Sequence, residues 1–465
     1  MAERTRRQLG AWYTPPELVQ RVVEAAITDE FVNRVGDRPI RVVDPACGDG
    51  RFLIAAASRI AALGGSSELV GVDVDPATID AVRSNETFSG NVVAINDDAL
   101  THDWRDAAPF DLVIGNPPFL SQMAATTTRG GASGRGGGPY ADAAVEFLAL
   151  AAELVDHDGG RVALVLPQSL LAARDAGPVR RRIDASAVMR WSWWAGEREF
   201  DAHVLTCALV FEFGAPSGAD RSGSTWSHVV TQRRNVPSVP AVMTQQGAGT
   251  LGDRVRLNAN FRDEYYGMVP AVGDHAEGPQ LITSGLIDPG HCLWGDRPIT
   301  FAKRRFDRPR LDLSTLNPKM TRWASDRLVP KVLIANQTKI IEAIADVEAT
   351  MLPGVPVVAA YPVTGTDVER TVWEVAAVLS SPVASAWAWQ QSAGTGLSAD
   401  AIRLGPVMLA GLPWPAGDLA DAIVAFRNRD LPACARNVHA AYGLTDDEFL
   451  ATWWYTALER IEARR

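Results

Sequence analysis

The chain has 465 residues, of which 47% are hydrophobic and 22% charged, and its formal net charge is -10. This balance excludes collagen-like, wholly disordered and disulfide-scaffold proteins. Because a single hydrophobic core stops growing at roughly 250–300 residues, two domains are expected. The basic N-terminus has no apolar core, no run of about 20 apolar residues occurs, and the four cysteines form no CxxC pair, so a soluble cytoplasmic protein is expected.

The first half of the chain alternates short apolar runs with amphipathic patterns, which is typical of a parallel sheet with crossover helices. The apolar runs predict strands at 40–44, 69–73, 92–95, 110–115, 162–166 and 205–213. Apolar residues at spacings of three and four predict helices at 17–26, 51–63, 76–85 and 143–155. A Gly-, Ser- and Pro-rich segment at 214–225 predicts a boundary between domains of residues 1–214 and 215–465.

The second half has less regular patterning. It predicts a strand at 331–335, a helix at 373–379 and a helical tail from about 419, and therefore a mixed α/β domain. We expect Trp387, Trp389 and Trp414 to be core or interface residues rather than ligand contacts. The glycine-rich residues 128–138 are expected to form a mobile loop.

Acidic residues follow three successive predicted strands of the first half. Residues 41–53, RVVDPACGDGRFL, form an apolar strand, a turn with Gly48 and Gly50, and a helix. Glycines in such a turn let the backbone approach a ligand closely. The next strand ends at Asp73, where a carboxylate can accept hydrogen bonds from both hydroxyls of a ribose, and the third leads into the acids of NDDAL at 96–100. Together these acids indicate an adenosine-containing cofactor.

The fourth strand ends in residues 111–119, DLVIGNPPF. Two consecutive prolines hold the chain in a rigid extended turn, because each fixes its own φ and restricts the residue before it. Such a turn can direct the side-chain oxygen of Asn116 and the carbonyl of Pro117 at one point, with Phe119 beside them as a stacking face. A purely structural strand terminator is the alternative interpretation.

From residue 10 to about 213 the sequence resembles the gamma class of N6-adenine DNA methyltransferases, which use S-adenosylmethionine (SAM). GAWYTPPELV at 10–19 resembles their N-terminal motif, DPACGDG at 44–50 their cofactor loop, and NPPF at 116–119 their catalytic motif, with Phe119 where many relatives have tyrosine. GGRVALVLPQSL at 159–170 resembles the next motif strand of that family. The resemblance implies an α/β fold, a Rossmann-like SAM-dependent methyltransferase sheet with a C-terminal mixed α/β target-recognition domain.

The resemblance also implies roles for individual residues. Those expected at the cofactor are Tyr13, Thr14, Pro15, Asp44, Ala46, Cys47, Gly48, Gly50, Asp73 at the ribose and Asp98, with Asp97 as the alternative, at the adenine amino group. The expected catalytic residues are Asn116, Pro117, Pro118 and Phe119, and Phe200 is expected as a second aromatic against the target base. No metal is expected.

The implied activity is site-specific transfer of a methyl group from SAM to N6 of an adenine that is flipped out of double-stranded DNA. Residues 331–339, 380–382, 394–397 and 412–415 resemble target-recognition domains more loosely. Restriction or other phage-defence partner proteins and a monomer or weak oligomer are expected. Only about ten residues precede the N-terminal motif, so no fused nuclease domain is expected in front of it.

Positive charge is concentrated in one segment of this acidic chain. Residues 297–339 contain 11 Lys and Arg against 3 Asp, a net charge of +8. The densest candidates for contact with the DNA backbone are Lys303, Arg304, Arg305, Arg308 and Arg310. A solvated charged face is the alternative interpretation of this segment.

The sequence is compatible with two other functions. Asn-Pro-Pro-aromatic motifs also serve methyltransferases that act on RNA or on a protein glutamine, because these substrates present a conjugated NH2 group. A non-catalytic DNA-specificity subunit with a degenerate methyltransferase fold is the second alternative. That alternative predicts a damaged cofactor loop or catalytic motif, whereas both are intact here.

Overall fold

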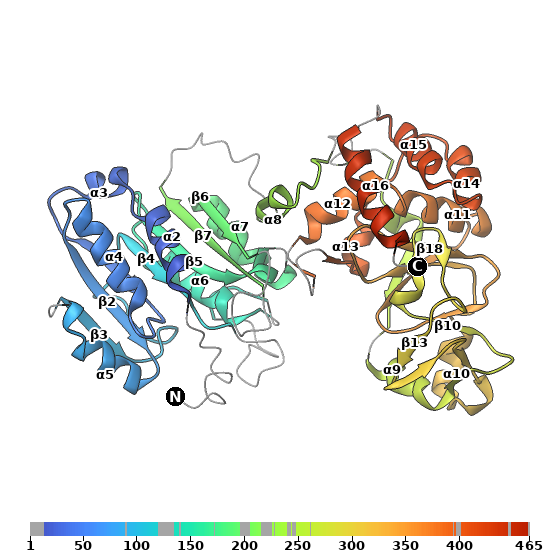
Figure 1. The fold of residues 1–465 in the computed structure, drawn as a ribbon, viewed down its shortest axis with the longest axis horizontal. Coiled ribbons are helices and arrows are strands. Elements are labelled where there is room, and N and C mark those ends of the chain that lie inside the picture. Colours follow the sequence, from blue (N-terminus) through green and yellow to red (C-terminus); the bar gives the residue numbers. More distant parts are fainter. Residues whose placement is uncertain are drawn as a thin grey trace. The chain divides into compact units, whose positions relative to one another are not determined.

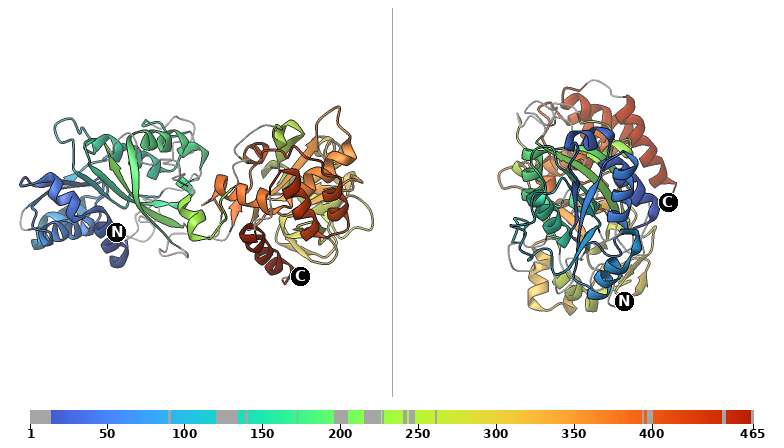
Figure 2. Two further views of the ribbon diagram at one scale, coloured as in Figure 1. Left: turned by 90° about the horizontal axis from the view of Figure 1, so that it is seen from above. Right: turned by 90° about the vertical axis from the view of Figure 1, so that its left-hand side faces the viewer.

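The computed structural model describes residues 14–88, 91–119, 134–138, 141–171, 173–195, 205–214, 226, 228–239, 243, 248–260, 262–393, 395–396, 401–444 and 448–463. The chain divides into two compact units, residues 1–230 and 231–465 (Figures 1 and 2). Each unit buries its own hydrophobic residues.

The N-terminal unit is built on a seven-stranded sheet of order β3-β2-β1-β4-β5-β7-β6. Its strands are β1 (Ile40–Asp44), β2 (Ser67–Asp73), β3 (Val92–Asn96), β4 (Leu112–Gly115), β5 (Arg161–Pro167), β6 (Ala187–Trp194) and β7 (Thr206–Phe213). The first five are parallel to one another, and β7 pairs antiparallel with both β5 and β6. This topology confirms the expected fold class, a Rossmann-like α/β sheet of the methyltransferase type.

Helices cover both faces of this sheet (Figures 1 and 2). They are α2 (Pro16–Ala26), α3 (Asp29–Val35), α4 (Arg51–Ala62), α5 (Pro76–Ser84), α6 (Ala143–Leu154) and α7 (Gly177–Ser186). The helices α2 and α4 pack on each other and on the central strands, while α6 and α7 pack on each other and on β5 and β6. The predicted strands and helices of this half are confirmed to within two residues at most ends, but the sequence missed α3, α7 and β6.

The central strands are apolar on both faces because both faces are covered. All seven residues of β5 and all four of β4 are buried. β6 instead lies at the sheet edge with mostly half-buried residues, so its sequence AVMRWSWW has no clean alternation and gives no strand signal.

The C-terminal unit is mixed α/β, as expected. One four-stranded antiparallel sheet has the order β18-β16-β20-β8. A second four-stranded sheet has the order β19-β10-β15-β9, and its β10 and β19 are parallel. The strands of the first are β8 (Val255–Ala259), β16 (Lys331–Ala335), β18 (Ala343–Asp346) and β20 (Val357–Pro362). Those of the second are β9 (Val272–Gly273), β10 (Gln280–Ile282), β15 (Arg310–Leu311) and β19 (Met351–Pro353).

Short strand pairs and helices complete this unit. The pairs are β11 (Ile287–Asp288) with β12 (His291–Cys292), β13 (Ile299–Phe301) with β14 (Arg304–Phe306), and β17 (Gln337–Thr338) with β21 (Ile402–Arg403). The helices are α8 (His228–Arg233), α9 (Arg262–Met268), α10 (Pro318–Ser325), α11 (Val368–Leu379), α12 (Pro382–Ser392), α13 (Pro406–Ala410), α14 (Ala420–Arg427), α15 (Leu431–Ala441) and α16 (Glu448–Glu462). Trp387, Trp389 and Trp414 are buried, as predicted.

Candidate active site

The loop after β1, residues 44–50, lets the backbone come close to a ligand. Gly48 and Gly50 have φ angles of 52° and 78°, a left-handed conformation that residues with a side chain disfavour. A Cβ added at Gly50 would lie 2.9 Å from the ring of Phe88, so packing requires that glycine. A Cβ at Gly48 would meet nothing within 4 Å, so Gly48 borders open space just before α4 begins.

Asp73, the last residue of β2, connects this glycine loop to the sheet. Its Oδ2 accepts a hydrogen bond from the backbone N–H of Gly48 at 2.9 Å, and its Oδ1 accepts one from Asp75 at 2.9 Å. Partial burial raises the pKa of the Asp73 carboxyl. Because each carboxylate oxygen carries a further lone pair, Asp73 can hold the loop and still accept from hydroxyls of a ligand.

Asp44, at the end of β1, is a buried carboxyl with an unmet acceptor. It is 1% exposed, and its Oδ1 accepts from the backbone N–H of Ala46 at 3.0 Å. Its Oδ2 has no hydrogen-bond partner among the described residues, and burial raises the pKa of this carboxyl to about 8. A Cβ on Gly115 at the end of β4 would overlap Asp44 Oδ1, so glycine there makes room for the carboxyl.

The side chain of Asn116, which follows β4, is oriented by Thr14. Asn116 Nδ2 donates a hydrogen bond to Thr14 Oγ1 at 3.0 Å, and Thr14 is buried. The two ends of an amide point in different directions, so Oδ1 of Asn116 is directed away from the Thr14 hydroxyl.

Arg51, the first residue of α4, joins the same arrangement. Its guanidinium donates to the carbonyl oxygen of Thr14 and pairs with the Asp49 carboxylate at 2.5 Å. The start of the described chain, the glycine loop and Asn116 are thereby connected by side-chain hydrogen bonds. Sequence reasoning missed Arg51, although its position directly after the glycine loop could have indicated a supporting role.

The NPPF turn, residues 116–119, lies at the same sheet edge as the glycine loop and Asp73. Parallel pairing of β4 with β1 and of β1 with β2 brings their carboxyl ends together. Pro117 and Phe119 are buried, whereas Asn116 and Pro118 are half-buried. Because Phe119 is only 6% exposed, a base can stack on its ring only after the ring or its neighbours move.

The two acids after β3 differ in their partners. Asp97 pairs with Nδ1 of His102 at 2.7 Å, and this hydrogen bond lowers the pKa of Asp97. Oδ1 of Asp98 accepts from the backbone N–H of Leu100 at 3.0 Å, and Asp98 is exposed. Since Asp97 is engaged by His102, Asp98 stays the candidate for an adenine amino group. The expected site residues Tyr13 and Phe200 lie outside the described residues.

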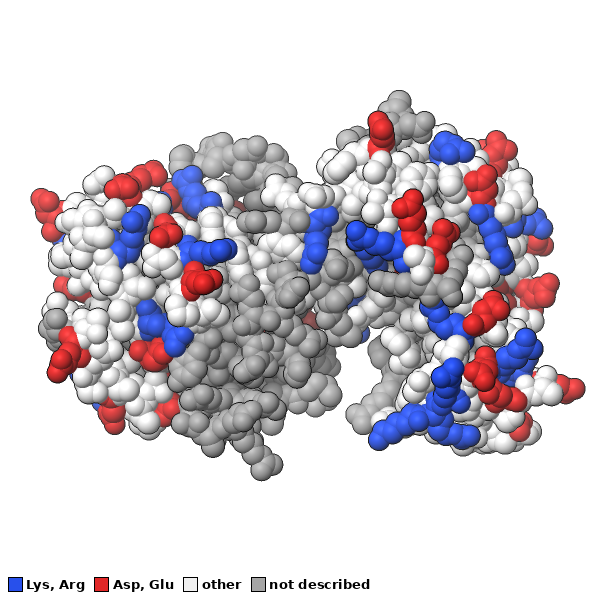
Figure 3. All heavy atoms as spheres, in the orientation of Figure 1, with Lys and Arg blue, Asp and Glu red and all other residues white. Residues whose placement is uncertain are grey.

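The predicted DNA-contacting cations sit around the β13–β14 hairpin of the C-terminal unit. Lys303 occupies the turn with a φ of 64°, after Ala302 with a φ of 47°, and the buried rings of Phe301 and Phe306 anchor the two strands. Arg305 is exposed, 3.9 Å from the Asp307 carboxylate. Figure 3 shows basic side chains gathered where Figure 1 places β13, α9 and α10.

Aromatic rings support the other cations of this group. The Arg304 guanidinium lies 5.2 Å from the ring centre of Phe306, and those of Arg308 and Arg310 lie 5.9 and 4.6 Å from that of Trp294. We call Lys303, Arg304, Arg305, Arg308 and Arg310 the hairpin cations. Such stacking holds a guanidinium at the surface with less conformational freedom.

One lysine of the basic segment is not at the surface. Lys331 is fully buried and pairs with Asp346 at 2.5 Å across β16 and β18. Burial lowers the pKa of Lys331, while the Asp346 carboxylate opposes that shift. The net +8 of residues 297–339 is therefore not all available to a polyanion, because the chain folds part of it into the core.

The described part of the chain contains no group of three or more His, Cys, Asp and Glu side chains that could hold a metal ion. Its helices include none that is both long enough and apolar enough to cross a membrane.

Comparisons with known proteins find a family match for the N-terminal part of the chain. Residues 1–188 match the family model described as N-6 DNA Methylase. The chain is 36% identical over 113 residues to the type II methyltransferase M.TthHB8I of Thermus thermophilus, covering 24% of this chain and 22% of that protein. It is 28% identical over 123 residues to M.CvrRI of Paramecium bursaria Chlorella virus XZ-6E, covering 26% and 27%.

The chain thus spans about a quarter of the length of these curated relatives. Among solved structures, the type I restriction-modification methyltransferase subunit from Streptococcus thermophilus is 21% identical, with a TM-score of 0.37 over 45% of this chain and 46% of that one. The EcoKI M protein is 20% identical, with a TM-score of 0.36 over 49% and 54%.

Proposed function

We propose that the protein transfers a methyl group from SAM to the N6 amino group of adenine in duplex DNA. The observation that carries this proposal is the meeting of the glycine loop, Asp73 and the NPPF turn at one edge of a methyltransferase sheet. The match of residues 1–188 to the N-6 DNA Methylase family supports the choice of reaction.

The residues at this edge fit SAM, which supplies an electrophilic methyl group on a sulfonium. The open space beside Gly48 accommodates a ligand close to the backbone. The remaining lone pairs of Asp73 suit ribose hydroxyls, and the partnerless Oδ2 of buried Asp44 suits a cationic or hydrogen-bond-donating group. Thr14, Pro15, Ala46, Cys47, Gly50 and Asp98 complete the proposed cofactor set, together with Tyr13.

Asn116 and Pro117 make the adenine amine able to attack. The lone pair of N6 is delocalised into the ring, which makes the nitrogen a poor nucleophile. Accepting its two hydrogens with Asn116 Oδ1 and the Pro117 carbonyl favours a tetrahedral nitrogen and stabilises the positive charge that develops there. Pro118 keeps the turn rigid, and holding the reactants together supplies up to ~7–11 kcal/mol in well-oriented systems.

The target adenine has to leave the DNA stack to reach this edge of the sheet. In our proposal Phe119 and Phe200 receive the flipped base. The C-terminal unit, residues 231–465, is in our proposal the target-recognition domain, and its hairpin cations contact backbone phosphates. A restriction or other phage-defence system would provide the partner proteins, in keeping with the curated relatives that are named type II methyltransferases.

Transfer of labelled methyl from SAM to duplex DNA, with RNA and protein extracts as parallel substrates, tests the proposal. We expect N6-methyladenine in digested DNA, and loss of at least about 100-fold in rate for Asn116→Ala with SAM affinity unchanged. Asn91→Ala, which replaces an exposed asparagine directly before β3, is the matched control. Methylation of RNA or protein instead of DNA, or full activity of Asn116→Ala, would overturn the proposal.

A further inference from the structure

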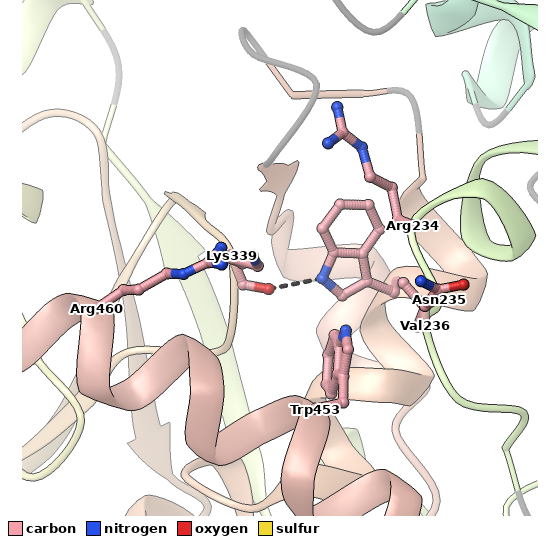
Figure 4. Close-up of a pocket in the computed structure, with 7 residues that line it drawn as sticks. Arg234, Asn235, Val236, Lys339, Trp453 and Arg460 are labelled. Atoms are coloured by element: carbon pink, nitrogen blue, oxygen red, sulfur yellow. Dashed lines mark hydrogen bonds between the residues drawn. The ribbon is translucent and has the colours of Figure 1, made fainter.

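A cavity of about 290 Å³ lies within the C-terminal unit and is lined by three cations and two indoles (Figure 4). The cations are Arg234, Lys339 and Arg460, and the indoles are Trp389 and Trp453. Arg234 follows α8, Lys339 follows β17, Trp389 belongs to α12, and Trp453 and Arg460 belong to α16. Segments distant in sequence thus converge on one pocket.

Several contacts fix the shape of this pocket. Trp389 is 1% exposed, and its indole N–H donates a hydrogen bond to the backbone carbonyl of Lys339 at 2.6 Å. Helices α12 and α16 pack against each other. Trp453 and Arg460 are seven residues apart on α16 and therefore share one face of that helix. Figure 4 shows Arg460 extending from α16 toward Lys339.

The charged side chains that line the pocket are all positive. No acidic residue lines it among the described residues, and the exposed Arg460 reaches into it from α16. An anion bound beside the Arg460 guanidinium would be attracted to it, because opposite charges at short range interact favourably. The protein as a whole carries a net charge of -10, so this concentration of cations is not a general property of its surface.

The combination of cations and indoles selects a class of anion. Guanidinium and ammonium groups bind phosphate through charge-assisted hydrogen bonds. An indole face stacks on nucleobases of any sequence, worth ~1–3 kcal/mol per base. The volume of about 290 Å³ is close to the lower end of the ~300–1,000 Å³ of small-molecule sites, which suits one nucleotide rather than a large cofactor.

We propose that this pocket binds one phosphate-bearing nucleotide unit, at a site in a different unit of the chain from the methyl-transfer residues. The phosphate lies between Arg460 and Lys339, and the half-exposed ring of Trp453 contacts the sugar or base. The nucleotide comes either from a DNA strand or from a free nucleoside phosphate. Binding of a nucleotide within a DNA strand rests on the proposed function. Binding of a free nucleoside phosphate does not depend on that function.

The test uses the full-length protein and three variants, Arg460→Ala, Trp453→Ala and the control Arg436→Ala. Arg436 is an exposed arginine on α15 outside the pocket. In one arm, fluorescence anisotropy follows binding of a labelled duplex at several salt concentrations. In the other arm, it follows a fluorescein-labelled nucleoside triphosphate, with unlabelled pyrophosphate as competitor. Unchanged thermal unfolding midpoints show that the variants fold.

If DNA is the source, Arg460→Ala lowers the salt slope of duplex binding by ~1 and Trp453→Ala weakens binding several-fold, while Arg436→Ala binds as wild type does. If a free nucleotide is the source, the same two variants lose at least about tenfold in triphosphate affinity with duplex binding unchanged. Wild-type behaviour of both variants in both arms would overturn the inference.

A methyl-transfer assay of the wild-type protein distinguishes failure of this inference from failure of the proposed function. If the wild type methylates DNA and the pocket variants bind both probes normally, only the pocket assignment fails. If the wild type methylates no DNA, the proposed function fails, and the triphosphate arm still decides whether the pocket binds a nucleotide.

Discussion

The side-chain amide of Asn116 donates a hydrogen bond to the hydroxyl of Thr14, 102 positions earlier in the sequence. This contact fixes which end of the amide is left for a substrate. The proposed reaction needs an acceptor there, because an adenine amine presents hydrogens. Thr14 thus acts as a positioning residue for the proposed catalytic asparagine.

Replacing Thr14 by valine tests this role. Valine has a similar shape but no acceptor, so Asn116 loses a hydrogen bond of about 1 kcal/mol and the orientation of its amide is less constrained. We expect kcat to fall by roughly 3- to 10-fold with little change in the KM for DNA. Thr14→Ser retains the hydroxyl and should keep most of the activity. Equal rates for the valine and serine variants would contradict the positioning role.

Asp73→Ala is expected to weaken SAM binding for two reasons. The carboxylate would be lost to the ribose, and the backbone N–H of Gly48 would lose its acceptor at 2.9 Å. Asp73→Asn separates these effects, since its amide oxygen can still accept from Gly48 while charge and one acceptor are lost. Calorimetry should give affinity in the order wild type, Asp73→Asn, Asp73→Ala. Unchanged SAM affinity in Asp73→Ala would remove Asp73 from the cofactor site.

The raised pKa of Asp44 predicts a pH dependence of stability. An unfolded aspartate has a pKa of ~3.9, whereas burial raises that of Asp44 to about 8 in the folded protein. The folded state binds this proton more tightly, so its contribution to stability is complete below about pH 4 and is lost as the pH rises to about 8. Asp44→Asn has no proton to lose.

Urea unfolding of both proteins between pH 4 and pH 9 measures this difference. The free energy of unfolding of wild type should fall relative to that of Asp44→Asn as the pH rises through this range. A parallel pH dependence of the two proteins would show that Asp44 ionises in the folded state as it does in the unfolded chain. Adding SAM should reduce the difference if the ligand brings a cation to Asp44.

The hairpin cations are expected to contribute to DNA affinity without regard to sequence. Lys303, Arg304 and Arg305 are exposed on one hairpin, so replacing all three by alanine removes charge and leaves the anchoring rings of Phe301 and Phe306. We expect the salt slope of duplex binding to fall by ~1 for each phosphate contact that is lost, with specific and non-specific DNA weakened alike.

Anisotropy titrations at several salt concentrations measure this slope. Arg436→Ala, which lies outside both the hairpin and the pocket, is the control. An unchanged slope in the triple variant would mean that these cations form only a solvated surface.

The sequence predicted the N-terminal sheet well because its strands are buried on both faces and its helices are amphipathic. It did equally well for the positions of Asp44, Asp73 and Asn116, since strand ends of a parallel sheet meet at one edge. The Thr14–Asn116 hydrogen bond could not be predicted from the sequence, because it joins the side chains of residues that are 102 positions apart. The roles assigned to Tyr13 and Phe200 remain predictions, because both residues lie outside the described part of the chain.

The C-terminal unit was harder to predict for a physical reason. Many of its strands are only two or three residues long, as in β9, β11 and β15, which is too short for a period of two to stand out. Charge alone also misled at Lys331. Lys331 belongs to the segment of net charge +8, which suggests a surface position, whereas its partner Asp346 lies on the adjacent strand and both are buried.

The close contact between Gly115 and Asp44 limits which residues can occupy the two positions together. Any side chain at 115 would occupy the space of the carboxyl at 44, so neither strand end is free to vary alone. Even a methyl group at 115 would require the buried carboxyl of Asp44 to move or to be replaced by a smaller side chain. The side-chain volumes at positions 44 and 115 are therefore coupled, at the junction of the glycine loop and the NPPF turn, and a substitution at one position constrains the other.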